Sequence, residues 1–137
     1  MLNRTVVIFG VFDGIHEGHL YLIKEAKKQG NRLVAIVARD EIVKELKGRV
    51  PKKNEVERIN ALLLVADVDL VLLGDPELET YNTLKEVSPS VVFIGYDQKA
   101  LFDSINKMMK KGSLPKMEVI QGEPYKPEIF HSSIMNK

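Results

Sequence analysis

The stretch GVFDGIHEGH, residues 10–19, stands between a short apolar run at residues 6–9 and an amphipathic segment at residues 20–28. The apolar run is typical of a buried strand, and the amphipathic segment is typical of a helix. His16 and His19 are three residues apart, so on a helix they share one face. In the first turn of a helix, unpaired N–H groups and the helix dipole favour a bound anion. Because glycines beside the turn also let the backbone approach a ligand closely, the stretch predicts a nucleotide triphosphate site.

Further apolar runs follow along the chain and alternate with amphipathic segments. These runs are residues 33–38, 70–73, 91–94 and 117–120. Repeated alternation of this kind predicts an α/β fold, a Rossmann-like, doubly wound parallel sheet of five strands with right-handed crossovers. No internal repeat, low-complexity segment or linker interrupts the pattern, so we expect a single domain over residues 1–137.

The segments between the runs carry local helix signals. Asp40 is expected to cap a short helix after the second strand. Asn54 and Glu57 have the spacing of a capping box and are expected to open the next helix. The apolar face of that helix is expected to comprise Val56, Ile59, Leu63 and Ala66, widened by Leu62 and Leu64. Pro76 is expected to begin a further helix, which must end before Pro89.

Charged and polar side chains follow the predicted strands. Asp13 and His16 come after the first strand, and Asp40 comes after the second. Asp97 comes after the fourth strand. In an open parallel sheet, ligands bind beyond the carboxyl ends of the strands, at a switch point in the strand order. The placement of these side chains therefore supports a ligand site at that edge.

The composition limits the class of protein. Hydrophobic residues make up 45% and charged residues 28% of the chain, as in an ordinary soluble globular protein. A formal net charge of +1 argues against a surface built for nucleic acid, and the lack of cysteine excludes disulfides and thiolate metal sites. No apolar run approaches the ~20 residues that a membrane helix needs, and no signal-peptide pattern is evident. We therefore expect a cytoplasmic protein that binds neither nucleic acid nor membrane.

Other ligand motifs fit the sequence less well. There is no G-x-x-x-x-G-K-[ST] P-loop, and Gly10 and Gly14 do not form G-x-G-x-x-G. Asp40 nevertheless stands where a ribose-binding acid lies in dinucleotide-binding folds, so that class stays open. The His-Glu-Gly-His spacing differs from the zinc motif H-E-x-x-H. His19 also continues the apolar face of its helix, so a packing role is the alternative for it.

Several motifs carry a resemblance to a known family. Residues 10–13 followed by residues 16–19 resemble the H-x-G-H signature of the nucleotidyltransferase superfamily, in its cytidylyltransferase-like branch. Four further motifs resemble archaeal FAD synthetases: ARD at 38–40, KGR at 47–49, ER at 57–58 and GYDQ at 95–98. The resemblance covers nearly the whole chain. Glycerol-3-phosphate cytidylyltransferases and the adenylyltransferase domain of heptose biosynthesis share the same frame.

The resemblance implies a specific reaction. In this superfamily a phosphate of the acceptor attacks the α-phosphorus of a nucleoside triphosphate, and pyrophosphate leaves. Because the attacking group is already an anion, catalysis is mostly positioning and stabilisation of charge. For this chain the resemblance implies transfer of AMP from ATP to FMN, with Mg²⁺ or another divalent ion accompanying ATP. A CTP-dependent enzyme acting on glycerol 3-phosphate or a heptose-type sugar phosphate stays open, as does a non-catalytic nucleotide-binding module. Small relatives are commonly dimers, which makes a homodimer one expected assembly.

The resemblance and the residue types together suggest roles for individual residues. The residues expected to stabilise charge in catalysis are His16, His19, Lys47 and Arg58. The residues expected to bind the nucleotide are Gly10, Val11, Phe12, Gly18, Gly95, Asp97, Ser132 and Ser133. The residues expected to bind the acceptor are Asp13, Asp40, Tyr96 and Gln98. No residue is assigned as a metal ligand, although Asp13 is expected to hold either its own loop or a metal ion.

Competing interpretations remain for part of this set. Lys47 lies in a basic loop before the helix that Asn54 opens, which contains Lys44, Lys47, Arg49, Lys52 and Lys53 and could simply be solvated. Arg58 lies outside the expected apolar face of its helix, so it could be a surface residue paired with Glu55 or Glu57. Ser132 and Ser133 match a serine- or threonine-rich segment that opens a final helix in relatives, but here only four residues follow. That last helix would therefore be short.

Overall fold

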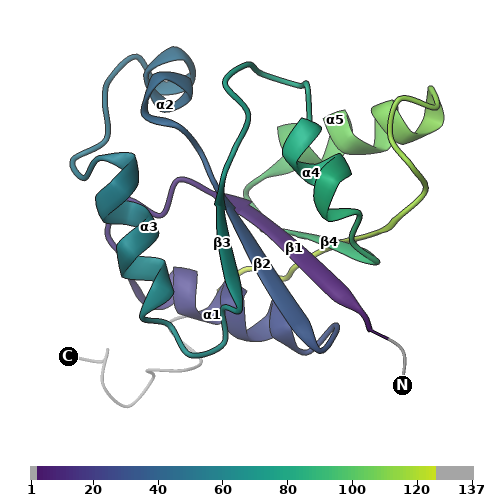
Figure 1. The fold of residues 1–137 in the computed structure, drawn as a ribbon, viewed down its shortest axis with the longest axis horizontal. Helices are drawn as coiled ribbons and strands as arrows, with labels where there is room; N and C mark the ends of the chain where they lie inside the picture. The colour runs from purple at the N-terminus through teal and green to yellow at the C-terminus, as the bar shows by residue number, and fades with distance from the viewer. Residues whose placement is uncertain (1–2, 126–137) are drawn as a thin grey trace.

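The computed structural model describes residues 3–125. Within this range a five-stranded sheet with the strand order β3-β2-β1-β4-β5 forms the centre of the molecule (Figure 1). The strands are β1 (Thr5–Gly10), β2 (Arg32–Val37), β3 (Leu70–Leu73), β4 (Val91–Ile94) and β5 (Glu118–Gln121). All neighbouring strands pair in parallel. The α/β fold with a five-stranded parallel sheet, predicted from the alternating pattern, is confirmed.

Helices cover both faces of the sheet. They are α1 (Glu17–Lys27), α2 (Asp40–Lys47), α3 (Glu55–Leu63), α4 (Asn82–Val87) and α5 (Lys99–Lys110). Figure 1 shows α1 and α3 on one side of the sheet and α4 and α5 on the other. Val6 packs with Ile23 of α1 and Leu62 of α3, whereas Val7 packs with Ile105 of α5. Successive residues of a strand point to opposite faces, so β1 joins the two apolar layers.

The strand β2 is apolar because both layers cover it. Residues 33–37 are each at most 4% exposed. Burying a side chain of this size contributes about 1.5–3 kcal/mol. Burial of this central strand therefore stabilises the sheet, whose carboxyl edge carries the loops described below. Among the described residues, no helix combines the length and the apolar character needed to cross a bilayer.

The strand order changes direction between β1 and β4. β1 pairs with β2 over six residue pairs, but with β4 only at Val6↔Val91 and Val7↔Val92. The second half of β1 therefore has no ladder partner in β4. In an open parallel sheet this switch point is where ligands bind.

The helix expected from Pro76 instead begins at Asn82. The cause is Asp75, whose carboxylate accepts hydrogen bonds from the N–H groups of Asn82 (2.5 Å) and Thr83 (2.9 Å). The Thr80 and Thr83 hydroxyls also donate to this carboxylate. A side chain seven residues upstream thus caps the helix, and the segment between them folds as a turn. The expected end of the helix before Pro89 is confirmed.

The start of α3 is as predicted, but its buried face is not. Asn54 Oδ1 accepts a hydrogen bond from the Glu57 N–H at 2.8 Å, and Glu57 Oε1 accepts one from the Asn54 N–H at 2.9 Å, which forms the expected capping box. Val56 and Leu63, expected in the core, are 61% and 57% exposed. Arg58, for which a surface position was the alternative to a phosphate contact, is 0% exposed. The acceptors that surround the Arg58 guanidinium determine which face of α3 points to the interior. A prediction based on the spacing of apolar residues does not take these acceptors into account.

The expectation that Asp40 caps α2 is also wrong. Arg39 occupies the N-cap position and makes no side-chain capping bond, and Asp40 is the first helical residue. The Asp40 carboxylate instead accepts hydrogen bonds from Arg58 at 2.7 Å and from the Glu55 N–H at 3.2 Å. Asp40 therefore joins α2 to α3.

Candidate functional site

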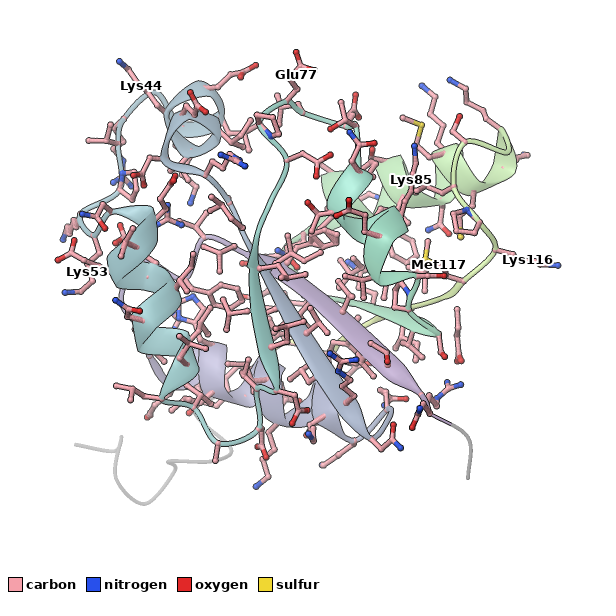
Figure 2. The ribbon with its side chains drawn as sticks, in the orientation of Figure 1. Lys44, Lys53, Glu77, Lys85, Lys116 and Met117 are labelled. Atoms are coloured by element: carbon pink, nitrogen blue, oxygen red, sulfur yellow. The ribbon has the colours of Figure 1, made fainter. Side chains whose placement is uncertain are left out.

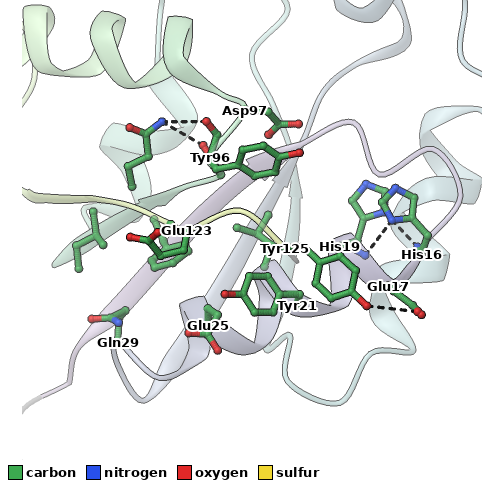
Figure 3. Close-up of a pocket in the computed structure, with 17 residues that line it drawn as sticks. His16, Glu17, His19, Tyr21, Glu25, Gln29, Tyr96, Asp97, Glu123 and Tyr125 are labelled. Atoms are coloured by element: carbon green, nitrogen blue, oxygen red, sulfur yellow. Dashed lines mark hydrogen bonds between the residues drawn. The ribbon is translucent and has the colours of Figure 1, made fainter. Parts of the chain in front are cut away.

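A cavity of about 870 Å³ lies at the carboxyl ends of β4 and β5, beside α1 (Figure 3). The residues that line it from α1 and the two positions flanking that helix are His16, Glu17, Gly18, His19, Tyr21, Leu22, Glu25 and Gln29. The residues that line it from β4, β5 and the loops after them are Phe93, Gly95, Tyr96, Asp97, Ile120, Gln121, Gly122, Glu123 and Tyr125. Small-molecule sites commonly measure ~300–1,000 Å³. Figure 3 shows the two imidazoles side by side at one end of the cavity and Gln29 at the other.

The histidine pair begins α1. His16 is the N-cap residue, and its Nδ1 accepts a hydrogen bond from the Gly18 N–H at 3.1 Å. His19 is the third helical residue, and its Nδ1 accepts a hydrogen bond from the His16 N–H at 3.2 Å. The two rings are stacked, with centroids 3.8 Å apart and an interplanar angle of 24°. The histidines thus form a capping box, in which each imidazole satisfies one otherwise unpaired backbone donor.

These hydrogen bonds define the chemistry of both rings. A nitrogen that accepts a hydrogen bond carries no proton, so each imidazole is neutral and carries its hydrogen on Nε2. Burial lowers the pKa of His19, and the adjacent His16 ring lowers it further, because two protonated rings would repel each other; Asp97 and a hydrogen bond to the Gly14 backbone act in the opposite direction. The site therefore presents neutral N–H donors together with the positive end of the α1 dipole. Such a group of donors suits an anion.

Phe12 shapes the loop before the histidines. Its backbone is left-handed, with φ of 54°, and its side chain is 2% exposed. The ring packs against the His19 ring with centroids 5.3 Å apart. A Cβ atom on Gly10 would approach this ring to 2.6 Å, so only glycine fits there. The loop is therefore held in place by its own Phe12 ring, which packs against Gly10 and the His19 ring.

Asp13 ties this loop to the basic loop before α3. Its Oδ2 accepts a hydrogen bond from the Lys52 N–H at 2.8 Å, and its Oδ1 accepts one from the Lys53 N–H at 2.9 Å. The same two bonds hold the pKa of the Asp13 carboxyl below its usual range. Lys47 ends α2 at the other end of the basic loop, and its side chain does not line the cavity. Figure 2 shows Lys44 and Lys53 projecting outward from this edge of the molecule.

Arg58 holds three segments together from the interior. Its Nη1 donates to the Val11 carbonyl at 2.8 Å, and its Nε donates to the Lys53 carbonyl at 3.0 Å. Its Nη2 donates to Asp40 Oδ1 at 2.7 Å. The guanidinium therefore joins the loop after β1, the basic loop and α2 in one network. In this arrangement all three guanidinium nitrogens donate to protein acceptors, and the side chain has no exposed surface.

The turn after β4 forms the wall opposite the histidines. Tyr96 is 53% exposed at the cavity, and Asp97 lies close enough to His19 to oppose the lowering of its pKa. Gln98 Oε1 accepts a hydrogen bond from the Gly95 N–H at 2.8 Å, and its Nε2 donates to the Phe9 carbonyl at 3.0 Å. The Gln98 carboxamide is thus engaged within the protein.

The structure brings together only part of the predicted site. Of the expected residues, those that line the cavity are His16, Gly18, His19, Gly95, Tyr96 and Asp97. Those that do not line it are Gly10, Val11, Phe12, Asp13, Asp40, Lys47, Arg58 and Gln98. Ser132 and Ser133 lie outside the described residues. Tyr21, Glu25 and Gln29 line the cavity but were not expected to, although their four-residue spacing places them on one face of a helix.

A second cavity of about 320 Å³ borders the carboxyl ends of β1 and β2 on the other face of the sheet. Its walls are mainly apolar and include Ile42 of α2, Leu101 of α5, and Tyr81. Phe9 and Ala38 line it at the strand ends. This second cavity therefore reaches Phe9, near the end of β1, but contains no residue of the loop that carries the histidines. Within residues 3–125 no cluster of three or more histidine, cysteine or acidic side chains is arranged to hold a metal ion.

Comparisons with known proteins agree with this fold. A family model described as cytidylyltransferase-like matches residues 7–135. A protein named FAD synthase from Thermococcus sibiricus is 34% identical over 93% of this chain and 86% of its own length. Another FAD synthase, from Methanohalobium evestigatum, is 40% identical over 80% of this chain and 71% of its own length. A crystal structure of a lipopolysaccharide core biosynthesis protein from Thermoplasma volcanium superposes with a TM-score of 0.81 at 30% identity, covering 90% of this chain and 99% of that one.

Proposed function

The chain belongs to the cytidylyltransferase-like family of nucleotidyltransferases, and on that premise we propose that it is an FMN adenylyltransferase. It transfers AMP from ATP to the phosphate of FMN, which yields FAD and pyrophosphate. The observation that carries the proposal is the stacked pair His16 and His19 at the start of α1, facing the turn after β4 across a ligand-sized cavity. The names of the relatives supply the acceptor.

The reaction is a direct in-line displacement. An oxygen of the FMN phosphate forms a bond to the α-phosphorus of ATP, the bond from that phosphorus to the bridging oxygen breaks, and pyrophosphate leaves with the electron pair. No base is needed to activate an oxygen that is already anionic. What the protein supplies is alignment of the two phosphates and stabilisation of the charge that develops between them.

The histidines stabilise that charge. Their Nε2–H groups donate to oxygens of the transferring phosphate, and the N-terminus of α1 adds its partial positive charge. Neutral donors serve here because they bind oxygen without holding the products by full ionic attraction. His19 has its pKa lowered, which supports a neutral ring at pH 7.

The basic loop supplies charge for the β- and γ-phosphates. Lys47 at the end of α2 reaches the triphosphate when this loop closes, and Asp13 anchors the other end of the loop through Lys52 and Lys53. Arg58 acts through the segments that it joins, because in the described arrangement its guanidinium is buried and fully bonded. Ser132 and Ser133 remain proposed phosphate ligands, and they lie outside the described residues.

The two cavities suit a reaction with two substrates. The larger one, which contains the histidines, Tyr96 and Asp97, accommodates ATP. The smaller apolar one borders Phe9, next to the loop at residues 10–15, to whose backbone we assign the α-phosphate, and it leaves room for part of the acceptor. ATP enters as its complex with Mg²⁺ or a similar divalent ion, since phosphate oxygens and water are the ligands that Mg²⁺ prefers. We also expect a cytoplasmic homodimer, which sedimentation velocity would detect.

The test is a substrate screen read by release of pyrophosphate. Each of the four nucleoside triphosphates is combined with FMN, glycerol 3-phosphate and a heptose phosphate, with and without Mg²⁺. Rapid turnover of ATP with FMN supports the proposal. The variant that tests the role of the histidine is His16→Asn, because asparagine still caps α1 but lacks the Nε2–H donor. We expect a loss of about 10²–10³-fold in kcat with little change in stability.

A sugar-phosphate acceptor is the second candidate. It is favoured by the likeness to the Thermoplasma volcanium protein, whose title names lipopolysaccharide core biosynthesis. Turnover with a heptose phosphate but not with FMN would establish this alternative. Tight binding of a triphosphate without turnover of any acceptor would indicate a nucleotide-binding module. Binding of NAD that depends on Asp40, without binding of ATP, would indicate a dinucleotide-binding protein.

A further inference from the structure

The side chain of Gln98 bridges the two strands at the switch point. β1 and β4 share ladder pairs only at Val6↔Val91 and Val7↔Val92. Beyond these pairs, Gln98 Nε2 donates to the Phe9 carbonyl of β1 at 3.0 Å, and Gln98 Oε1 accepts from the Gly95 N–H after β4 at 2.8 Å. One carboxamide therefore lies between a carbonyl of β1 and the N–H of the residue that follows β4. The two bonds join segments that are 89 residues apart in sequence.

The position of Gln98 in the chain makes this use of its side chain unusual. Gln98 is the N-cap residue of α5, yet its side chain makes no capping bond to that helix. Its own N–H donates to the Gly95 carbonyl at 3.0 Å, which closes the turn from residue 95 to residue 98. A Cβ atom on Gly95 would lie 3.2 Å from Gln98 Oε1 and 3.3 Å from Asp97 Oδ1, so glycine lets the amide sit against the turn.

The bridge connects the two halves of the candidate site. His16 and His19 follow β1, whereas Tyr96 and Asp97 stand on the turn after β4. The separation of these halves depends on how far β1 and β4 part at their carboxyl ends. An amide inserted between the strands fixes that separation, because it satisfies both backbone groups at hydrogen-bonding distance.

From this geometry we propose that Gln98 is a positioning residue, which replaces the missing ladder between β1 and β4 and thereby sets the distance from the Tyr96–Asp97 turn to the histidine pair. It touches neither substrate. Only a side chain with a donor and an acceptor on one planar group makes both bonds. The expected effect of Gln98 on turnover rests on the proposed function. The expected effect of Gln98 on the affinity for ATP does not.

The first test compares Gln98→Ala with Asn106→Ala. Asn106 also lies on α5, where its amide donates to the Phe102 carbonyl at 2.9 Å, and it lines neither cavity. Displacement of a binding group by about 1 Å can cost about 10²-fold in rate. We expect Gln98→Ala to lower kcat/KM for ATP by about 10–100-fold with an unchanged KM for FMN, and Asn106→Ala to stay within about 3-fold of wild type.

The second test uses Gln98→Glu. As a carboxylate, the new side chain still accepts from the Gly95 N–H but faces the Phe9 carbonyl without a hydrogen to donate. As a neutral carboxylic acid it makes both bonds, as the amide does. The activity of the variant, divided by that of wild type at each pH, should therefore rise as the pH falls from 8 to 5.5. Wild type measured at the same pH values is the reference, because His16, His19 and Asp97 lie on the segments that face this position.

Binding of ATP measured by calorimetry separates this inference from the proposed function. If wild type turns over no FMN but Gln98→Ala still binds ATP more weakly, the proposed function fails and the positioning role stands. If Gln98→Ala binds and turns over ATP as wild type does, the positioning role is overturned. A pH-independent ratio for Gln98→Glu would overturn it as well, and this variant decides the matter if Gln98→Ala does not fold.

Discussion

Replacement of Arg58 by alanine should lower the free energy of unfolding by about 3–5 kcal/mol, which is the cost of breaking a buried ion pair from one side. The side chain is 0% exposed and donates three hydrogen bonds, at 2.7, 2.8 and 3.0 Å. Alanine leaves the Val11 and Lys53 carbonyls without these donors, at about 1 kcal/mol each. The larger part of the lost stability comes from the Asp40 carboxylate, which loses its charged partner. Its side chain is 35% exposed, so water solvates part of the unpaired charge and reduces this loss.

The magnitude is large relative to the total stability of a small domain, which is about 5–15 kcal/mol. Equilibrium unfolding in urea, followed by circular dichroism, measures it directly. Arg58→Lys keeps the charge, but one ammonium cannot replace a planar fork that serves three separate acceptors, so we expect it to recover less than half of the loss. Lys53→Ala is the matched control, because the Lys53 side chain is exposed and only its backbone joins the network.

A double-mutant cycle with Asp40→Asn tests the reasoning itself. If the ion pair carries the effect, Arg58→Ala should cost about 1–3 kcal/mol less in the Asp40→Asn background than in wild type. Additive losses would refute the coupling between the two side chains. A loss below about 1 kcal/mol for Arg58→Ala alone would refute the buried network, since that is the range of an exposed ion pair.

Three further outcomes are expected from the structure. The pKa of His19, already lowered mainly by burial, should fall further in Asp97→Asn, because the Asp97 carboxylate favours the protonated ring; an NMR titration measures this, and a rise would contradict it. Burial alone would raise the pKa of Asp75, but four donated hydrogen bonds lower it to about 2, so its stabilising effect is complete above about pH 4 and is lost as the pH falls toward 2. Asp75→Asn should therefore cost about 1–2 kcal/mol at pH 7, allowing for solvent screening, and the difference from wild type in urea unfolding should shrink at pH 3. Leu62→Ala should cost about 2–5 kcal/mol and Val56→Ala under about 0.5 kcal/mol, since only Leu62 is buried; equal costs would show that the assigned face of α3 is wrong.

The local patterns of the sequence were sufficient for the framework. Buried parallel strands are apolar throughout, so the runs at 70–73 and 91–94 coincide with β3 and β4 to the residue. The capping box of Asn54 and Glu57 was predicted because its two hydrogen bonds join residues three apart. For the same reason, the turn-and-histidine stretch at residues 10–19 could be assigned to the start of a helix.

The patterns failed wherever a polar side chain is bonded to a distant segment. Arg58 reaches Asp40 and Val11 across 18 and 47 residues. A prediction from apolar periodicity places an arginine at the surface, so it assigned the wrong face of α3 to the core. Asp75 is bonded over a shorter range, to the N–H of Asn82 seven residues later. It was missed because a capping residue is expected directly before the first helical residue.

The sequence by itself thus determined the order of strands and helices, the histidine pair at a helix start and the edge of the sheet where the candidate site lies. These depend on periodicity and on contacts within a few residues. Only the tertiary structure decided which polar groups are free to face a ligand and which are bonded internally. Gln98 and Arg58 were assigned to ligand binding from the family resemblance. Their acceptors, on β1 and on the loop that follows it, come close only when the sheet assembles, so the sequence did not reveal them.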